Sequence, residues 1–189
     1  MRIPSFLRPV IAPGDVSRER HVKTFRAEIE AAAATADRAR LEALLERPKQ
    51  LGLADEDAEL ECEHLAGLLA AADLREHLAR GDPLEVIPTQ HSAIAGERCH
   101  FLAPASFPDG LMDQGGKLFL TDARVLYLGH SRHEAAWPHV SEVRDQDRDV
   151  FLTVRPLDLL RFRFNSYVDA LRAAEIARHL SRAARAARG

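Results

Sequence analysis

Residues Gly116–Gly129 read GKLFLTDARVLYLG and contain two short runs of strand-forming residues around a tight turn. Lys117–Thr121 and Arg124–Leu128 are rich in aliphatic and aromatic residues, which are enriched in β-strands. Only Asp122 and Ala123 separate the two runs, and a two-residue connection between strands predicts a β-hairpin. This stretch therefore predicts an antiparallel sheet in the C-terminal half of the chain.

The segments that follow extend the same pattern toward the C-terminus. Apolar and mostly polar residues alternate along Val150–Arg155 and again along Leu159–Phe164, as in an antiparallel sheet with one solvated side. A final helix is expected to begin after Asn165 or Ser166 and to run to about Ala187.

Further strand candidates lie on both sides of the hairpin. They are Leu84–Thr89, Arg98–Pro104, Ala135–Trp137 and Val140–Arg144. After Pro83 the period of the apolar residues changes from about 3.6 to 2, which places a domain boundary there. Residues 84–189 are therefore expected to form six or seven short strands closed by one helix.

The N-terminal half has a helical pattern. Residues 1–16 are expected to form an extended lead punctuated by prolines, and residues 17–82 predict two or three packed helices. Ser17 is the expected N-cap of the first helix, and Thr35 or Asp37 is expected to restart it. The whole chain is thus predicted to be α+β, with a helical segment ahead of an antiparallel β domain.

The composition limits the function classes. The chain has 189 residues, 46% of them apolar and 29% charged, which is enough to bury a core. A formal net charge of −3 gives no overall attraction to nucleic acid or acidic membranes. Prolines interrupt the N-terminal residues, so no signal peptide is expected, and no run approaches the ~20 apolar residues of a spanning helix. We expect a cytoplasmic protein with reduced thiols.

No catalytic motif is present. The glycines have neither of the spacings used by phosphate-binding loops, and the sequence contains no nucleophile elbow, HExxH helix or EF-hand loop. The sequence therefore favours a protein that is not an enzyme and uses no cofactor. An enzyme without a recognised motif ranks below the binding functions.

Two groups of residues contain side chains that can bind metal ions. Cys62, His64, Cys99 and His100 are residue types that bind zinc. Positions i and i+2 of a helix point about 160° apart, however, and adjacent strand residues face opposite sides. The spacing therefore favours a buried cysteine and a helix histidine. His130, His133 and His139 are similarly interpreted as members of a solvated loop, since only Glu134 adds a carboxylate.

Positive charge gathers at the C-terminus. Residues 160–189 contain seven arginines against Asp169 and Glu175, which amounts to +5. The candidate surface for a membrane or a partner consists of Arg161, Arg163, Arg178, Arg182 and Arg185. The first two share the polar face of a strand, and the other three lie on one stripe of the final helix. Near an anionic membrane each contributes roughly 1 kcal/mol. The alternative is that they keep an alanine-rich helix in solution.

Gly96–Phe101 read GERCHF, and Trp137–Val143 read WPHVSEV. Together with Gly116–Gly129, these segments resemble the opening strand, the following strand and the central hairpin of bacterial PH-like and GRAM-like domains. The resemblance covers about residues 84–183. It implies a seven-stranded, partly open β-barrel capped by a C-terminal helix, of a kind that typically binds lipid headgroups or proteins without catalysis.

The resemblance does not extend to phosphoinositide recognition. PH domains that bind phosphoinositides usually carry basic residues in the loop between their first two strands. If Arg98–Pro104 is the first strand, that loop is about Ala105–Gly115, which has no lysine or arginine. If Leu84–Thr89 comes first, the loop Gln90–Gly96 has His91 alone.

Two functions follow as hypotheses. The first is a module for protein–protein interaction with an adaptor or regulatory role, in which the β domain is a rigid scaffold and the helices dock a partner or regulate access. The alternative is peripheral binding to anionic lipids through the arginine-bearing helix. Nucleic acid is disfavoured as a partner, because few aromatic residues are available to stack on bases.

Overall fold

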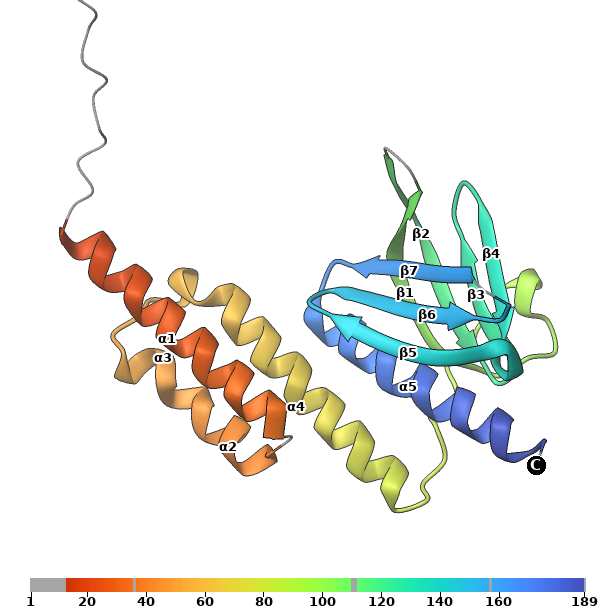
Figure 1. Cartoon of the computed structure of the whole chain (residues 1–189), viewed down its shortest axis with the longest axis horizontal. Coiled ribbons are helices and arrows are strands. Elements are labelled where there is room, and N and C mark those ends of the chain that lie inside the picture. Colours follow the sequence, from red (N-terminus) through yellow and green to blue (C-terminus); the bar gives the residue numbers. More distant parts are fainter. Residues whose placement is uncertain (1–12, 36, 110–111, 157, 189) are drawn as a thin grey trace, which may run out of the picture. The chain divides into compact units, whose positions relative to one another are not determined.

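The computed structural model describes residues 13–35, 37–109, 112–156 and 158–188 (Figure 1). The chain divides into two compact units, Met1–Leu65 and Ala66–Gly189. The division falls inside helix α4 (Glu59–Ala79), and each unit is described separately below.

The first unit is helical, as the sequence predicts. Its elements are α1 (Pro13–Thr35), α2 (Arg38–Ala43), the 3₁₀ turn η1 (Leu44–Glu46), α3 (Arg47–Gln50), the 3₁₀ turn η2 (Asp55–Asp57) and the start of α4. Its buried side chains include Phe25, Ile29, Leu41 and Leu65. Asp37 caps α2 as expected, because its carboxylate accepts a hydrogen bond from the Arg40 backbone N–H at 3.1 Å.

Two features of this unit differ from the sequence-based expectations. Ser17 is not an N-cap, because α1 already begins at Pro13, and proline is well suited to the first helical turn. The sequence also predicts that the acidic residues from Asp55 to Glu63 form a helix start with a solvated face, but Glu61 on the first turn of α4 is not solvated. Glu61 is 5% exposed and accepts two hydrogen bonds from the Arg26 guanidinium, at 3.0 and 2.5 Å.

The second unit is a seven-stranded antiparallel sheet with a C-terminal helix. Its elements are η3 (Ser92–Ile94), β1 (Cys99–Asp109), β2 (Met112–Thr121), β3 (Arg124–Leu128), β4 (Arg132–Ala136), η4 (Trp137–His139), β5 (Val140–Gln146), β6 (Asp149–Val154), β7 (Asp158–Phe164) and α5 (Tyr167–Ala186). The strand order is β4-β3-β2-β1-β7-β6-β5. The sheet is not closed into a barrel, because β4 and β5 are its two edges and do not pair.

Helix α5 packs on the sheet, chiefly against β5, as Figure 1 shows. Ser166 is its N-cap, with the side chain accepting from the Asp169 backbone N–H at 3.0 Å. Small residues let the helix approach closely, and Ala170, Ala173, Ala174 and Ala177 are all buried. Two antiparallel meanders joined through β1 and β7, with one helix against them, make a PH-like α+β fold.

The strand predictions near the centre of the sheet are confirmed, and one prediction is wrong. Leu84–Thr89 forms no strand; a single backbone hydrogen bond, from Ile87 N–H to the Cys99 carbonyl at 2.7 Å, joins it to β1. Pro83 and Pro88 remove backbone donors at both ends of this segment. Residues 82–91 are therefore called the linker.

The prediction of a loop over Ala105–Gly115 is also wrong. β1 and β2 continue to pair as far as Asp109 opposite Met112, so most of that segment is strand. The connection between them lies outside the described residues. Among the described helices, none is both long and apolar enough to cross a membrane.

Candidate functional site

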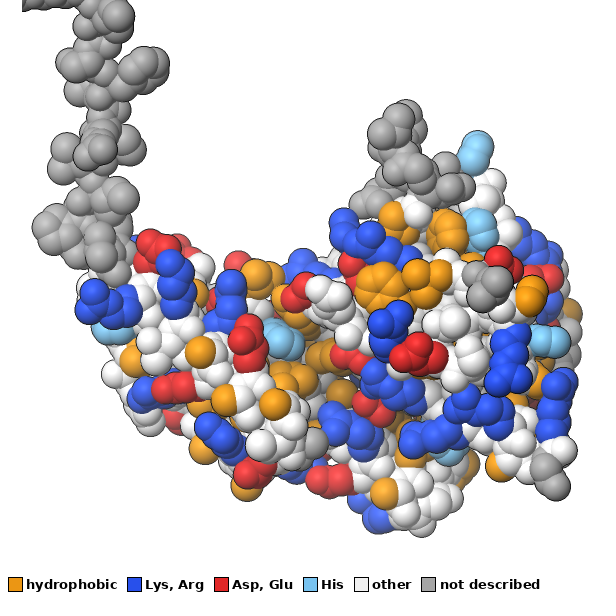
Figure 2. Space-filling view, viewed as in Figure 1, with side chains coloured by type: hydrophobic (Ala, Val, Ile, Leu, Met, Phe, Trp, Pro, Cys, Tyr) orange, Lys and Arg blue, Asp and Glu red, His pale blue; other side chains and the backbone are white. Residues whose placement is uncertain are grey.

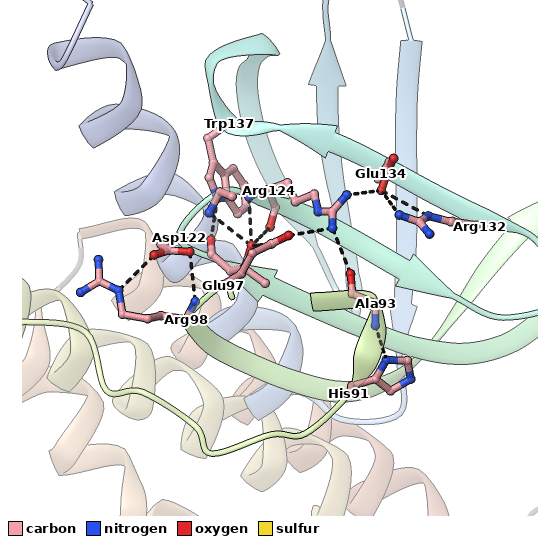
Figure 3. Close-up of polar contacts among 11 residues, drawn as sticks. His91, Ala93, Glu97, Arg98, Asp122, Arg124, Arg132, Glu134 and Trp137 are labelled. Atoms are coloured by element: carbon pink, nitrogen blue, oxygen red, sulfur yellow. Dashed lines mark hydrogen bonds and ion pairs between the residues drawn. The ribbon is translucent and has the colours of Figure 1, made fainter. Parts of the chain in front are cut away.

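The residues that carry the family resemblance form a hydrogen-bonded network (Figure 3). The Thr121 hydroxyl donates to Glu97 Oε2 at 2.6 Å and accepts from the Arg124 backbone N–H at 3.0 Å. The Arg124 guanidinium completes the triangle by donating to Glu97 Oε1 at 2.7 Å. Thr121 is fully buried, so its hydroxyl needs these partners.

The same guanidinium links three further parts of the chain. It donates to Glu134 Oε2 on β4 at 2.7 Å and to the Ala93 carbonyl at 3.0 Å. The Trp137 indole N–H donates to the Thr121 carbonyl at 2.7 Å, which holds η4 under the hairpin. The network therefore fixes η3, the β2–β3 turn and the end of β4 to one another, and its role is structural.

Sequence reasoning recognised these residues only as a family pattern. Glu97 and Arg124 are 27 positions apart, and nothing local in the sequence indicates that they meet. The available signal was the Thr-x-x-Arg spacing across the two-residue turn, because it places a hydroxyl and a guanidinium on neighbouring strand ends.

Two of the three helix arginines of the candidate surface, Arg178 and Arg185, contact β5. Arg178 is paired with Glu175 at 2.9 Å and with Asp145 of β5. Arg185 donates to the Ser141 carbonyl at 2.7 Å, which covers part of the free edge of β5. Arg182 donates to the carbonyl of Arg178, at 3.2 Å, on its own helix. The charge of Arg178 is therefore neutralised by carboxylates of its own unit.

The two strand arginines share one carboxylate. Asp149 of β6 accepts from the Arg161 guanidinium at 2.6 Å and from Arg163 at 3.0 Å. Burial alone would raise the pKa of Asp149, but the hydrogen bonds from Arg163 and Arg161 outweigh it and hold the pKa below its ordinary value. Asp149 is therefore charged near neutral pH.

Because the folded-state pKa of Asp149 is depressed, its stabilisation is present above pH ~4 and lost as the pH falls through the lower folded-state value. We expect Asp149→Asn to lower the free energy of unfolding by about 1–2 kcal/mol at pH 7. The difference from wild type should shrink below pH 4, as measured by urea unfolding. Asp158→Asn, at an exposed position on β7, is the control. A difference that is constant with pH would contradict this interpretation.

The outer face of β5–β7 carries an aromatic side chain between arginines. Arg144 of β5 is the cross-strand neighbour of Phe151, and Phe151 is the neighbour of Arg161 of β7. The Arg161 guanidinium lies 5.7 Å from the centre of the Phe151 ring. A hollow of about 200 Å³ opens beside this row, and Leu159 on its wall is 55% exposed.

These four residues, Arg144, Phe151, Leu159 and Arg161, are called the Phe151 face. Figure 2 shows hydrophobic side chains beside basic ones over this part of the sheet. The alternation along β6 explains the exposure of the ring, because Val150 and Leu152 point into the core and Phe151 points out.

The histidines and cysteines are placed apart. The His133 ring stacks on Phe107, with centroids 3.8 Å apart, and its Nε2 lies 2.8 Å from the Ser131 hydroxyl. Both cysteines are free; burial raises the pKa of the Cys99 thiol, and burial and Glu61 raise that of Cys62. Within the described part of the chain, no three His, Cys, Asp or Glu side chains are grouped so that they could hold a metal ion.

Comparisons with known proteins return structures only. No protein-family model and no curated protein matches the chain. The C-terminal domain of an unknown protein from Leishmania infantum is 10% identical, with a TM-score of 0.41 over 47% of this chain and 88% of that one.

Structures of RhoGEF DH/PH domains also match. The linker-DH/PH domains of p115-RhoGEF are 11% identical with a TM-score of 0.41, and the match covers 79% of this chain and 53% of that one. The DH/PH domains of PDZ-RhoGEF, in complex with activated RhoA, are 12% identical with a TM-score of 0.43 over 81% and 54%. This chain spans about half the length of these structures. At such similarity the fold assignment rests on the strand order and the C-terminal helix.

Proposed function

We propose that this chain is a PH-like, GRAM-like module that binds a protein partner through the Phe151 face and has no catalytic role. One observation carries the proposal: a half-buried phenylalanine and an exposed leucine lie beside two arginines on a rigid sheet. Aromatic residues and arginine are enriched at the centres of protein–protein interfaces, where a few anchors supply most of the binding energy.

The hollow beside the ring supports a protein partner rather than a flat membrane surface. Its volume of about 200 Å³ suits one or two inserted side chains, and the exposed Arg144 lies on its wall, whereas Asp145 on the same wall is paired with Arg178. A recess that accepts side chains beside an arginine favours one protein surface over general attraction to anionic lipid. In this proposal the module works in the cytoplasm, where the free thiols of Cys62 and Cys99 persist.

Peripheral membrane binding is the second candidate, and the exposed end of α5 favours it. Arg182, Arg185 and Arg188 are exposed there. Arg178 does not belong to this set, because its removal would break the pair with Asp145. A test of membrane binding therefore needs the triple variant Arg182/Arg185/Arg188→Ala.

The protein-partner proposal is tested by affinity capture from extracts of the source cells, followed by quantitative mass spectrometry. We expect a defined partner to be enriched by the wild type and reduced about tenfold or more by Arg144→Glu combined with Leu159→Ser. The matched control combines Arg20→Glu with Leu45→Ser, because it makes the same changes at exposed residues outside the face, and Leu45 is 54% exposed.

Capture that is equal for both double variants would overturn the proposed surface. Flotation of the purified chain with anionic liposomes is the parallel arm. Salt-sensitive flotation that is lost in the Arg182/Arg185/Arg188→Ala variant would transfer the function to membrane binding.

A further inference from the structure

A second hollow lies on the same unit, between the linker, the start of β1 and the C-terminal part of α5. Its volume is about 490 Å³, within the ~300–1,000 Å³ range of small-molecule sites. Its walls combine Leu84, Val86 and Leu180 with Arg98, His100 and His179. This hollow is called the His179 groove, and neither the network around Arg124 nor the Phe151 face includes any of these residues.

One side of the groove is apolar and continuous with the core. Leu180 is buried, and Leu84 packs against the same hydrophobic cluster. Val86 on the rim is 48% exposed, and Ala183 and Ala184 of α5 leave room beside it. An aliphatic body placed here would cover apolar surface that water now contacts.

The other side is polar and has an excess of positive groups. Asp122 is already bound by the Arg98 backbone N–H at 3.1 Å and by Arg98 Nε at 3.0 Å, so it offsets the charge of Arg98. Arg182 lies close enough to act electrostatically on His179. Among the groups that line the groove, Arg98 and Asp122 offset each other, so a protonated His179 would give the polar side a net positive charge.

The tautomer of His100 follows from its partner. His100 Nδ1 lies 2.8 Å from the Glu85 carbonyl, which can only accept a hydrogen bond. Nδ1 therefore carries hydrogen, and Nε2 of the same ring becomes a donor when the ring is protonated. A protonated His100 can thus bind an acidic group without losing its contact with the linker.

We propose that the His179 groove binds a small amphiphile with an acidic head and a short aliphatic body. The head lies against Arg98, His100 and His179, and the body lies along Leu84, Val86 and Leu180. This site goes beyond the proposed function, because it uses a different surface and a different class of ligand.

The electrostatics of His179 give the binding a pH dependence. Burial, Arg182 and His100 together lower the pKa of His179, so it is neutral at pH 7. The charged groups near its ring are Arg98 and His100 of the β1 segment, Asp122 of the hairpin turn and Arg182 of α5. An acidic head would favour the imidazolium, so binding takes up a proton and is tighter at lower pH.

The test uses the full chain and NMR of the histidine rings, with octanoate as the probe. We expect octanoate to shift the His179 and His100 signals and to raise the pKa of His179. For each unit of that rise, octanoate should bind about tenfold more tightly below the pKa than above it. Acetate, which lacks the aliphatic body, should bind at least about tenfold more weakly.

Variants separate the site from general effects. Ala183→Phe, at an exposed position, should fill the groove and abolish binding. His179→Gln should keep binding but lose most of its pH dependence, whereas His139→Gln, at an exposed position outside the groove, should change neither. Unchanged binding in Ala183→Phe would overturn the proposal.

Three other results would also overturn the proposal. They are octylamine binding as tightly as octanoate, the absence of any shift at His179, and binding of a peptide with a C-terminal leucine but not of octanoate. The last result would show that the groove accepts a protein terminus rather than a free amphiphile.

Discussion

Replacing Arg124 by methionine is expected to lower the free energy of unfolding by about 3 kcal/mol, because the half-buried Glu97 carboxylate loses its charged partner and the Ala93 carbonyl loses a donor. The Arg124 side chain is only 23% exposed, and its partner Glu97 is 18% exposed. The change removes charge-assisted hydrogen bonds to Glu97, Glu134 and the Ala93 carbonyl at once. Methionine keeps much of the aliphatic stem, so the loss reports the guanidinium rather than the packing.

The matched control is Arg98→Met, a few residues away in the same region. Arg98 pairs with Asp122 at 3.0 Å, a distance close to that of the Arg124 pairs, but its side chain is 70% exposed. Exposed pairs contribute about 0–1 kcal/mol, so this variant should cost less than about 1 kcal/mol. Equal losses for the two variants in urea unfolding at pH 7 would show that the Arg124 network does not hold η3 and β4 to the hairpin.

The sheet could be predicted from the sequence because its signals are local. The Lys117–Leu128 hairpin has both alternation and a two-residue turn, and the pairs Leu118↔Tyr127 and Leu120↔Val125 confirm it. Val150–Arg155 and Leu159–Phe164 likewise keep one face for the core. In such segments the period of the apolar residues is enough to indicate both the strand and its buried face.

The linker could not be predicted from the same signals. Leu84, Val86 and Ile87 suit a strand, but prolines on both sides limit the pairing to one backbone hydrogen bond. The apolar residues of this segment face the core and the His179 groove instead of a neighbouring strand. The prolines and this packing together keep the segment out of the sheet.

The candidate arginines show the same limit on sequence reasoning. Their common stripe on α5 is a local property and was predictable from the helical period. Their partners were not: Asp145 is 33 positions from Arg178, and Asp149 is 12 positions from Arg161. A cluster that totals +5 in the sequence is therefore partly neutralised by carboxylates of β5 and β6.

In the sequence Glu175 is one of two acidic residues among the C-terminal arginines, and in the structure it is a buried partner of two arginines. It is 7% exposed and lies between Arg178, at 2.9 Å, and Arg75 of α4, at 3.3 Å. The pair with Arg75 joins the Ala66–Ala79 part of α4 to α5.

Gly67 of α4 lies close against the start of α5, and Gly67→Val is expected to destabilise the fold by about 3 kcal/mol. A Cβ at this position would lie 2.9 Å from the Tyr167 carbonyl carbon and 3.0 Å from its oxygen. The atoms that would have to move belong to the backbone at the first residue of α5, directly after its N-cap Ser166. They cannot rotate away as a flexible side chain would, so the helices must separate.

Ala66→Val is the matched control, because it adds the same β-branched side chain to an exposed position of the same helix. Its cost should be about 0.5 kcal/mol, the usual loss of helix propensity. Thermal and urea unfolding of the two variants measures the difference. Gly67→Ala sharpens the test, since alanine would stabilise a free helix by up to about 1 kcal/mol. If Gly67→Ala is more stable than the wild type, α4 and α5 do not pack at this contact, whereas a loss of stability locates the contact at this single residue.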